Sequence, residues 1–147
     1  MKYTAELTID LPRKKVVRLF DNTENTFLWQ PGLRSLKLIQ GSDRKEGARY
    51  LIVYEGRKED LAVEETVVKR NLPDEFITVH RSRGVKNTIH HLFVENTPQQ
   101  TMWRMVNQFR FSGMMRLMAP WMKQAFAGNT LLHMERFKRF AESTRTT

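Results

Sequence analysis

Apolar and polar residues alternate along most of the first 111 positions, which is the pattern of β-strands with one buried face. The alternation predicts a strand over residues 2–10 and six more over 33–41, 47–56, 59–70, 75–83, 87–96 and 101–111. Short segments with Gly, Asn, Asp or Pro separate the last six, and such turns favour antiparallel pairing of consecutive strands. We therefore expect a seven-stranded antiparallel sheet.

Two short helices are predicted between the first and second strands. Pro12 suits the first turn of a helix that runs to about Asp21. Residues 21–23 then provide a break and a new N-cap. The second helix carries Phe27, Leu28 and Trp29 and ends before Pro31-Gly32.

A long amphipathic helix is predicted in the C-terminal part of the chain, with Pro120 either starting or kinking it. At 100° per residue, one stripe holds Met122, Phe126, Thr130, His133, Phe137 and Phe140. Thr130 and His133 are polar members of this stripe, and methionine adapts to irregular apolar space. The combination favours a helix laid over a sheet with a cavity between them.

Opposite charges across one predicted hairpin indicate the register of the sheet. A tight turn at residues 71–74 places Glu64 opposite Arg81, which pairs unlike charges side by side. The same register places Glu65 opposite His80. A tight turn in the following hairpin then places His80 opposite His91.

This register predicts which face of the sheet points inward. The inward face reads Val63, Glu65, Val67, Phe76, Thr78, His80, Ile89, His91, Phe93, Trp103, Met105, Asn107, Phe109 and Phe111. The outer face carries Arg70, Arg81, Arg83, Arg104, Gln108 and Arg110, which suits contact with solvent. A slip of one residue gives a competing assignment that buries Ile77, Val79, Arg81, Leu92 and Val94 instead.

Length and composition indicate one globular domain that spans residues 1–147. No apolar run approaches the roughly 20 residues of a membrane helix, so membrane insertion is not expected. The chain has no cysteine, which excludes disulfides and thiolate metal sites and fits a cytoplasmic location.

The net charge of +9 raises the question of a polyanionic partner. The 25 Lys and Arg residues are scattered, and no recognition helix, Gly-rich loop or zinc motif accompanies them. Nucleic-acid binding is therefore not expected beyond nonspecific charge attraction. A basic surface that serves as an interaction module is kept as an alternative function, and a homodimer is left open.

Several short motifs occur in a characteristic order along nearly the whole chain. They are Ile9-Asp10-Leu11-Pro12, Trp29-Gln30-Pro31-Gly32-Leu33, Glu65-Thr66-Val67, Leu72-Pro73, Gly84-Val85 with Asn87, Phe109-Arg110-Phe111-Ser112-Gly113 and Phe137-Lys138. In this order they resemble the SRPBCC superfamily, the polyketide cyclase/dehydrase and START-like group. The resemblance implies an α+β helix-grip fold, in which a curved seven-stranded antiparallel sheet surrounds a long C-terminal helix and a deep apolar cavity. It implies no shared catalytic motif.

Glu65, His80 and His91 are the strongest candidates for chemistry, because the predicted register sets them side by side on three strands. A carboxylate beside an imidazole can orient it as a general base, which a cyclisation or dehydration would require. A hydrogen-bonded polar lining of a wet cavity is the simpler interpretation. Cross-strand spacing is not a specific metal signature, so neither a metal nor a cofactor is expected.

The leading hypothesis is a protein that binds an apolar or aromatic small molecule, lipid-like or polyketide-like, between the sheet and the last helix. The residues predicted to bind it are Trp29, Tyr50, Tyr54, Glu65, His80, His91, Phe93, Trp103, Asn107, Met122, Phe126 and His133. The alternative is a cyclase or dehydratase that uses Glu65 with His80 or His91.

Overall fold

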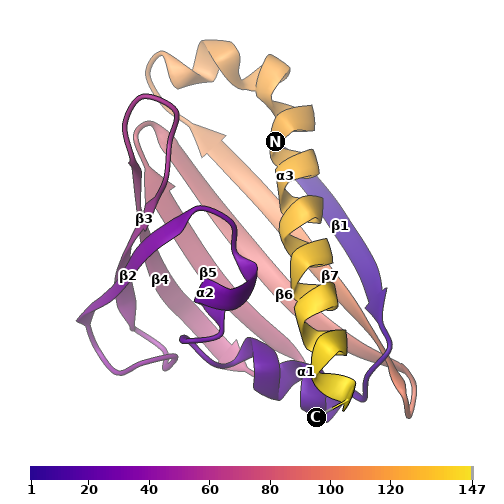
Figure 1. Ribbon diagram of the computed structural model, residues 1–147. Helices are drawn as coiled ribbons and strands as arrows, with labels where there is room; N and C mark the ends of the chain where they lie inside the picture. The colour runs from indigo at the N-terminus through magenta and orange to yellow at the C-terminus, as the bar shows by residue number, and fades with distance from the viewer. Residues whose placement is uncertain (147) are drawn as a thin grey trace.

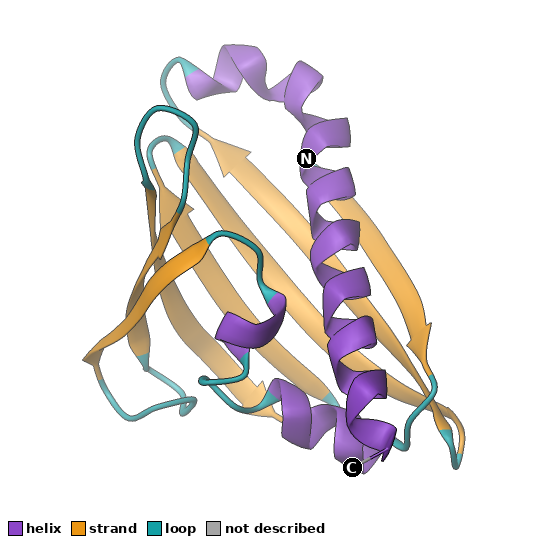
Figure 2. Cartoon of the chain, in the orientation of Figure 1, coloured by secondary structure: helices purple, strands orange, loops and turns teal. Residues whose placement is uncertain are grey.

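The computed structural model describes residues 1–146, in which one curved sheet wraps around a long helix (Figure 1). The elements follow the predicted order (Figure 2). They are β1 (Lys2–Ile9), α1 (Arg13–Phe20), α2 (Thr26–Trp29), β2 (Leu33–Gln40), β3 (Arg49–Tyr54), β4 (Leu61–Asn71), β5 (Glu75–Ser82), β6 (Val85–Thr97), β7 (Gln100–Phe111), α3 (Met115–Ser143) and the 3₁₀ turn η1 (Thr144–Thr146). This arrangement confirms the α+β helix-grip fold.

The sheet is antiparallel throughout, with the order β1-β7-β6-β5-β4-β3-β2. Consecutive hairpins build β2 to β7, and β1 closes the far edge by pairing with β7. Between β4 and β5, Glu64 lies opposite Arg81 and Glu65 opposite His80, as the charge pairing predicted.

The predicted register between β5 and β6 was wrong. His80 lies opposite Asn87, and His91 lies opposite Phe76. The strands are joined by a two-residue turn with Gly84 at φ +66°, so β6 begins at Val85, earlier than predicted. The partner of each residue moves by four positions, and an even shift leaves the same side chains facing inward.

The predicted outer position of Arg70 was also wrong. The pairing of β4 with β5 shifts register between Val67 and Lys69, which marks a β-bulge. The bulge reverses the alternation beyond it, so Arg70 turns to the inner side and its side chain is 23% exposed. Elsewhere the inward face is as predicted. The competing assignment, in which the opposite face of β5 and β6 points inward, is wrong. Of its five residues only Val79 is buried, whereas Arg81 and Val94 are exposed.

α3 begins at Met115, before Pro120, which lies inside the helix. Figure 1 shows the helix crossing one end of the sheet in its first turns and then bending to run along the concave face. Proline has no N–H for the helical ladder and causes such bends. No helix of residues 1–146 combines the length and the hydropathy needed to span a bilayer.

An aromatic core fills the space between the sheet, α1 and the C-terminal half of α3. Phe20 from α1 lies 5.1 Å from Phe93 and 6.2 Å from Phe137, measured between ring centroids. Trp103 stacks on Phe93 at 5.9 Å and meets Phe137 edge-on at 5.1 Å. Phe93, Trp103 and Phe137 are all at most 1% exposed. This end of the sheet is therefore solid.

Candidate functional site

A cavity of about 480 Å³ lies between the concave face of the sheet and α3. Aromatic side chains form much of its wall, including Phe20, Trp29, Phe76, Trp103, Phe109 and Phe126. Polar side chains from β4, β5, β6 and β7 lie on the same wall, between these rings. A concave chamber with aromatic rings on its wall and polar groups placed between them is a form that small-molecule sites commonly take.

Glu65 and His80 form a hydrogen-bonded carboxylate–imidazole pair on the cavity wall. The His80 Nε2 and Glu65 Oε2 atoms are 2.6 Å apart, because the two residues are directly opposite on β4 and β5. Burial alone would raise the pKa of Glu65, but the charge of His80 and its hydrogen bond outweigh burial and lower that pKa. Burial, together with the nearby Glu65 charge, raises the pKa of Tyr54.

His91 is held apart from that pair. The indole Nε1 of Trp103 donates a hydrogen bond to His91 Nδ1 at 3.2 Å. An indole nitrogen can only donate, so the neutral imidazole carries its proton on Nε2. Burial lowers the pKa of His91 to about 3. His91 is therefore a neutral donor at ordinary pH rather than a general base.

Asn87 and Asn107 form a buried amide pair beside the Glu65–His80 pair. Asn107 is 0% exposed and Asn87 is 8% exposed. Asn87 Nδ2 donates to Asn107 Oδ1 at 3.1 Å. Asn87 Oδ1, Asn107 Nδ2 and the nearby Thr78 hydroxyl have no hydrogen-bond partner within residues 1–146. The Trp29 indole Nε1 also lacks a partner among these residues, so four unpartnered polar groups lie on residues of the cavity wall.

Tyr3 continues this polar band to the far edge of the sheet. Its hydroxyl lies 2.6 Å from the Thr130 hydroxyl and donates to the carbonyl oxygen of Phe126 at 3.1 Å. Tyr3 lies opposite Asn107, which in turn lies opposite Ile89. Burial raises the pKa of Tyr3, although the bond with Thr130 opposes this. The contact ties β1 to the middle of α3 over the cavity.

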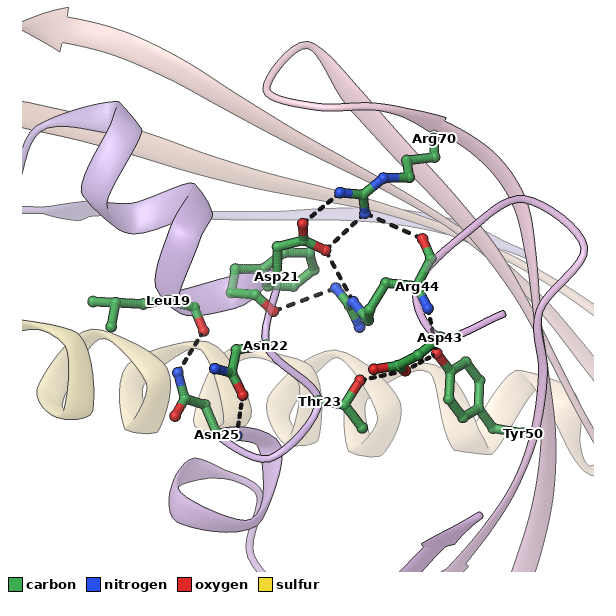
Figure 3. Close-up of polar contacts among 10 residues, drawn as sticks. Leu19, Asp21, Asn22, Thr23, Asn25, Asp43, Arg44, Tyr50 and Arg70 are labelled. Atoms are coloured by element: carbon green, nitrogen blue, oxygen red, sulfur yellow. Dashed lines mark hydrogen bonds and ion pairs between the residues drawn. The ribbon is translucent and has the colours of Figure 1, made fainter. Parts of the chain in front are cut away.

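A second polar network seals the cavity near the end of α1 (Figure 3). Asp21 accepts hydrogen bonds from Arg70 Nη1 at 2.7 Å and from Arg44 Nε at 3.1 Å. The Arg44 guanidinium lies 4.8 Å from the ring centroid of Phe76 and 5.2 Å from that of Phe20. Burial would raise the pKa of Asp21, but the hydrogen bonds and charges of both arginines lower it overall.

Tyr50 belongs to this network and not to the cavity wall. Its hydroxyl donates to Asp43 Oδ1 at 2.5 Å and accepts from the Arg44 backbone N–H at 2.7 Å (Figure 3). Burial and the Asp43 carboxylate raise the pKa of Tyr50 to about 12. Asp43 also accepts from the Thr23 hydroxyl at 2.7 Å. Tyr50 thus anchors the β2–β3 turn against the segment after α1.

No protein-family model matches the sequence, and no curated protein matches it. Solved structures do match in fold. The Zhui aromatase/cyclase from Streptomyces sp. R1128 has a TM-score of 0.79 at 10% identity, over 97% of this chain and 93% of that one. A START superfamily protein from Mycobacterium smegmatis has 0.78 at 13%, over 97% and 98%. Ara h 8.0201 has 0.73 at 11%, over 97% and 98%. This chain shares the helix-grip fold of these structures.

The helix-grip fold brings most of the predicted site residues to one cavity. Those on its wall are Trp29, Tyr54, Glu65, His80, His91, Trp103, Asn107, Phe126 and His133. Tyr50, Phe93 and Met122 are not on it. Phe93 is enclosed by Phe20 and Trp103 in the solid core, and Met122 precedes Phe126, the first α3 residue to reach the cavity.

Sequence reasoning missed Asn87 and Thr78 as site residues. The sequence predicts Asn87 as the first residue of a strand that in fact begins at Val85, so Asn87 was expected at the edge of the sheet rather than in the site. Thr78 was placed on the inward face but not in the site, since nothing in the sequence shows that its hydroxyl has no partner. The available signal was the alternation of β6 itself, which continues through Asn87, Ile89 and His91.

No group of three or more His, Cys, Asp or Glu side chains within residues 1–146 could hold a metal ion. Glu65 and His80 supply two potential ligands, but His91 is engaged with Trp103 through Nδ1. What the arrangement offers chemically is a paired carboxylate and imidazole, a neutral imidazole donor, and free amide and hydroxyl groups.

Proposed function

We propose that this protein binds an apolar or aromatic small molecule, lipid-like or polyketide-like, in the cavity between the sheet and α3. The main support for this proposal is a cavity of about 480 Å³. Aromatic rings form much of its wall, and neutral polar groups on the wall have no hydrogen-bond partner in the described part of the chain. Burial of unpartnered polar groups costs free energy that a ligand can recover. The helix-grip fold, shared with the Zhui aromatase/cyclase and the START superfamily protein, supports the same proposal.

The entrance for such a molecule lies between the β3–β4 turn and α3. Glu55 and Gly56 from that turn and Asn129 from α3 are exposed residues that also line the cavity. The polar groups of Asn107 and Thr78 are buried at 0% and 2% exposure. A ligand entering here would therefore place its apolar body among the rings and its polar end against β5, β6 and β7.

Native mass spectrometry of the purified protein tests this proposal, combined with titration of the neutral dye N-phenyl-1-naphthylamine. We expect a retained small molecule or a saturable gain in dye fluorescence. Met105→Trp, which adds volume to the cavity wall, should abolish both. Met102→Trp is the matched control, because Met102 is on the same strand with its side chain on the opposite face. Absence of both signals in the wild type would overturn the proposal.

A second candidate function is proton transfer by the Glu65–His80 pair. The 2.6 Å contact between Glu65 Oε2 and His80 Nε2 favours it, since the carboxylate fixes the proton on Nε2 and leaves Nδ1 as the basic nitrogen. Cyclisation or dehydration next to a carbonyl needs such a base. His91 is no longer a candidate for this role, because Trp103 occupies its Nδ1.

Hydrogen–deuterium exchange at the carbon next to the 2-tetralone carbonyl, followed by NMR, tests the enzymatic alternative. Catalysed exchange should be lost in His80→Gln and retained in His90→Gln, whose side chain is on the other face of the sheet. Exchange at the uncatalysed rate with wild-type protein, while the dye still binds, would leave the binding function alone.

A further inference from the structure

The polar end of the ligand can be specified from the three strand residues on the cavity wall whose polar groups have no partner within residues 1–146. We infer that Asn87, Asn107 and Thr78 form a subsite for a neutral hydroxyl group on an aromatic ligand, one that accepts a hydrogen bond and donates another. This inference rests on the proposed binding function and names the class of ligand: neutral, hydroxylated aromatic molecules.

The amide pair defines the hydrogen-bonding character of the subsite. One hydrogen bond joins Asn87 to Asn107, and each amide has one C=O and one NH₂ group. If both side chains were rotated by 180°, the roles of the two residues would exchange. In either arrangement the pair leaves one NH₂ group and one C=O group without a partner. A hydroxyl can accept from the first and donate to the second.

The hydroxyl of Thr78 adds a third unpartnered group to the same wall. Thr78 and Asn107 both lie opposite Ile89, on β5 and β7 respectively, and Asn87 is two residues before Ile89 on β6. Thr78 and Asn107 therefore flank Ile89 from the two neighbouring strands, and Asn87 is the next residue along the same face of β6. Each is at least nine-tenths buried, so bulk water does not compensate them.

The charged side chains on the cavity wall favour a neutral ligand, because each already has a hydrogen-bond or ion-pair partner. The two central charges on the cavity wall already have partners: Glu65 is paired with His80, and Arg44 with Asp21. Glu55, at the exposed rim, is 3.4 Å from Arg34. No other Lys, Arg, Asp or Glu among residues 1–146 lines the cavity. A carboxylate or an ammonium group would therefore be desolvated without a free counter-ion, which is costly.

The aromatic side chains beside the subsite favour a ligand whose apolar part is an aromatic ring. Phe109 lies opposite Asn87 and stacks on Phe126 with centroids 4.8 Å apart and planes 11° apart. Phe126 comes from α3, so the pair bridges the cavity from sheet to helix. Trp103 and Phe76 line the inner side. A flat ring can contact such surfaces edge-on or offset-stacked.

An ordered water that bridges the free groups is the competing explanation. Buried waters typically satisfy otherwise unpartnered polar groups in this way. A ligand hydroxyl reproduces the hydrogen bonds of such a water and displaces it without loss, whereas a hydrocarbon does not. The two explanations therefore differ in whether a hydroxyl improves binding.

Three probes of one ring system test the inference by tryptophan-fluorescence titration and calorimetry: 2-naphthol, naphthalene and 2-naphthoate. Wild-type protein should bind 2-naphthol about 10-fold or more tightly than naphthalene, and 2-naphthoate more weakly still. Asn107→Leu should reduce the preference for naphthol over naphthalene to about 3-fold or less. Gln108→Leu is the matched control and should keep it, because Gln108 is the adjacent amide on the exposed face.

Thr78→Val is the second variant, because it preserves shape and keeps the inference testable if Asn107→Leu does not fold. It should also reduce the naphthol preference. Equal binding of naphthol and naphthalene by the wild type would overturn the inference and leave the proposed function standing. So would a naphthol preference unchanged in a folded Asn107→Leu and in Thr78→Val, or stronger binding of naphthoate. Failure of all three probes, together with failure of the neutral dye, would instead overturn the proposed function.

Discussion

The two ends of α3 meet the same sheet in different ways. Around Phe137 the space is filled, since Phe20, Trp29 and Trp103 all have ring centroids within 6.2 Å of the Phe137 ring. Around Phe126 the helix faces a cavity, and Phe126 itself is only partly buried. One helix therefore seals the fold at its C-terminal end and covers a chamber nearer its start.

The difference comes from what lies beneath the helix. At the filled end, α1 inserts Phe20 between sheet and helix, where it contacts Phe76, His91 and Phe93 as well. At the hollow end, the sheet presents two amides and the hydrogen-bonded Glu65–His80 pair, and those groups do not pack as rings do. Stability is thus concentrated at one end, and binding chemistry at the other.

The largest expected effect contrasts the two phenylalanines of α3. Phe137→Ala should lower the free energy of unfolding by about 3–5 kcal/mol, because it leaves a new cavity in a filled core. Phe126→Ala should lower it by less, since its ring already borders open space. Urea denaturation of both variants measures this. Equal losses would contradict the distinction between a solid and a hollow end.

The next effect is a dependence of stability on pH. Burial lowers the pKa of His91 to about 3, from an ordinary value of 6.5. Between these values the unfolded chain binds a proton that the folded protein does not. The stability that depends on this group is therefore fully present above about pH 6.5. It decreases as the pH is lowered below that value, by up to about 1.4 kcal/mol per pH unit.

Urea denaturation at pH 7 and pH 5 measures this contribution, to which His133 adds in the same direction because burial and the Arg136 charge also lower the pKa of His133. The pKa of Glu65 is lowered, so its contribution is present above its unfolded pKa and is lost only at more acidic pH. His91→Gln keeps an acceptor for the Trp103 indole. It should reduce the difference in the free energy of unfolding between pH 7 and pH 5. His90→Gln, on the outer face, should preserve it. A wild-type protein equally stable at both values would show that His91 is not buried in neutral form.

A smaller effect should distinguish the two halves of α3 in mobility. Tyr3→Phe removes the hydroxyl that contacts Thr130 and the Phe126 carbonyl, at a cost of about 0.5–1.5 kcal/mol. Amide hydrogen exchange should accelerate at residues 126–130 and stay unchanged at residues 134–141, which are anchored in the filled core. Uniform acceleration along the helix would show that its halves are not separately anchored.

The smallest expected effect has the opposite sign. Thr78→Val removes a buried hydroxyl that has no partner, so it should stabilise the ligand-free protein slightly, by up to about 1 kcal/mol. Thr88→Val, on the outer face of β6, is the control and should gain less. Thermal unfolding measures both. A clear loss of stability in Thr78→Val would show that this hydroxyl already has a partner, such as a bound water.

The fold could be predicted from the sequence to the extent that it depends on alternation. The positions of the strands and the inward face followed from it, and the opposite charges of Glu64 and Arg81 gave the pairing of Glu65 with His80. The failures came from single-residue features that alternation does not reveal. The bulge before Lys69 turned Arg70 inward, and the two-residue turn at Gly84 moved His91 away from His80.

The candidate site was predicted in outline for the same reason. Inward residues near the middle of the strands necessarily line the space under α3, and most of the predicted set does. Hydrogen-bond partners could not be predicted, because they depend on side-chain directions to within about an ångström. The bond from Trp103 to His91 and the missing partner of Asn107 are both of this kind.

The pairing of β1 with β7 has a consequence for how the protein assembles. The Thr101 hydroxyl donates to the Leu11 carbonyl, 90 residues earlier in the chain. Closing so long a loop costs about 4 kcal/mol of chain entropy, whereas the hairpins from β2 to β7 form between neighbours in sequence. During synthesis those hairpins can therefore form first, and the docking of β1 and α3 completes the wall last. The chamber would then exist only after the slowest step of folding, and a small molecule captured at that step would draw folding to completion.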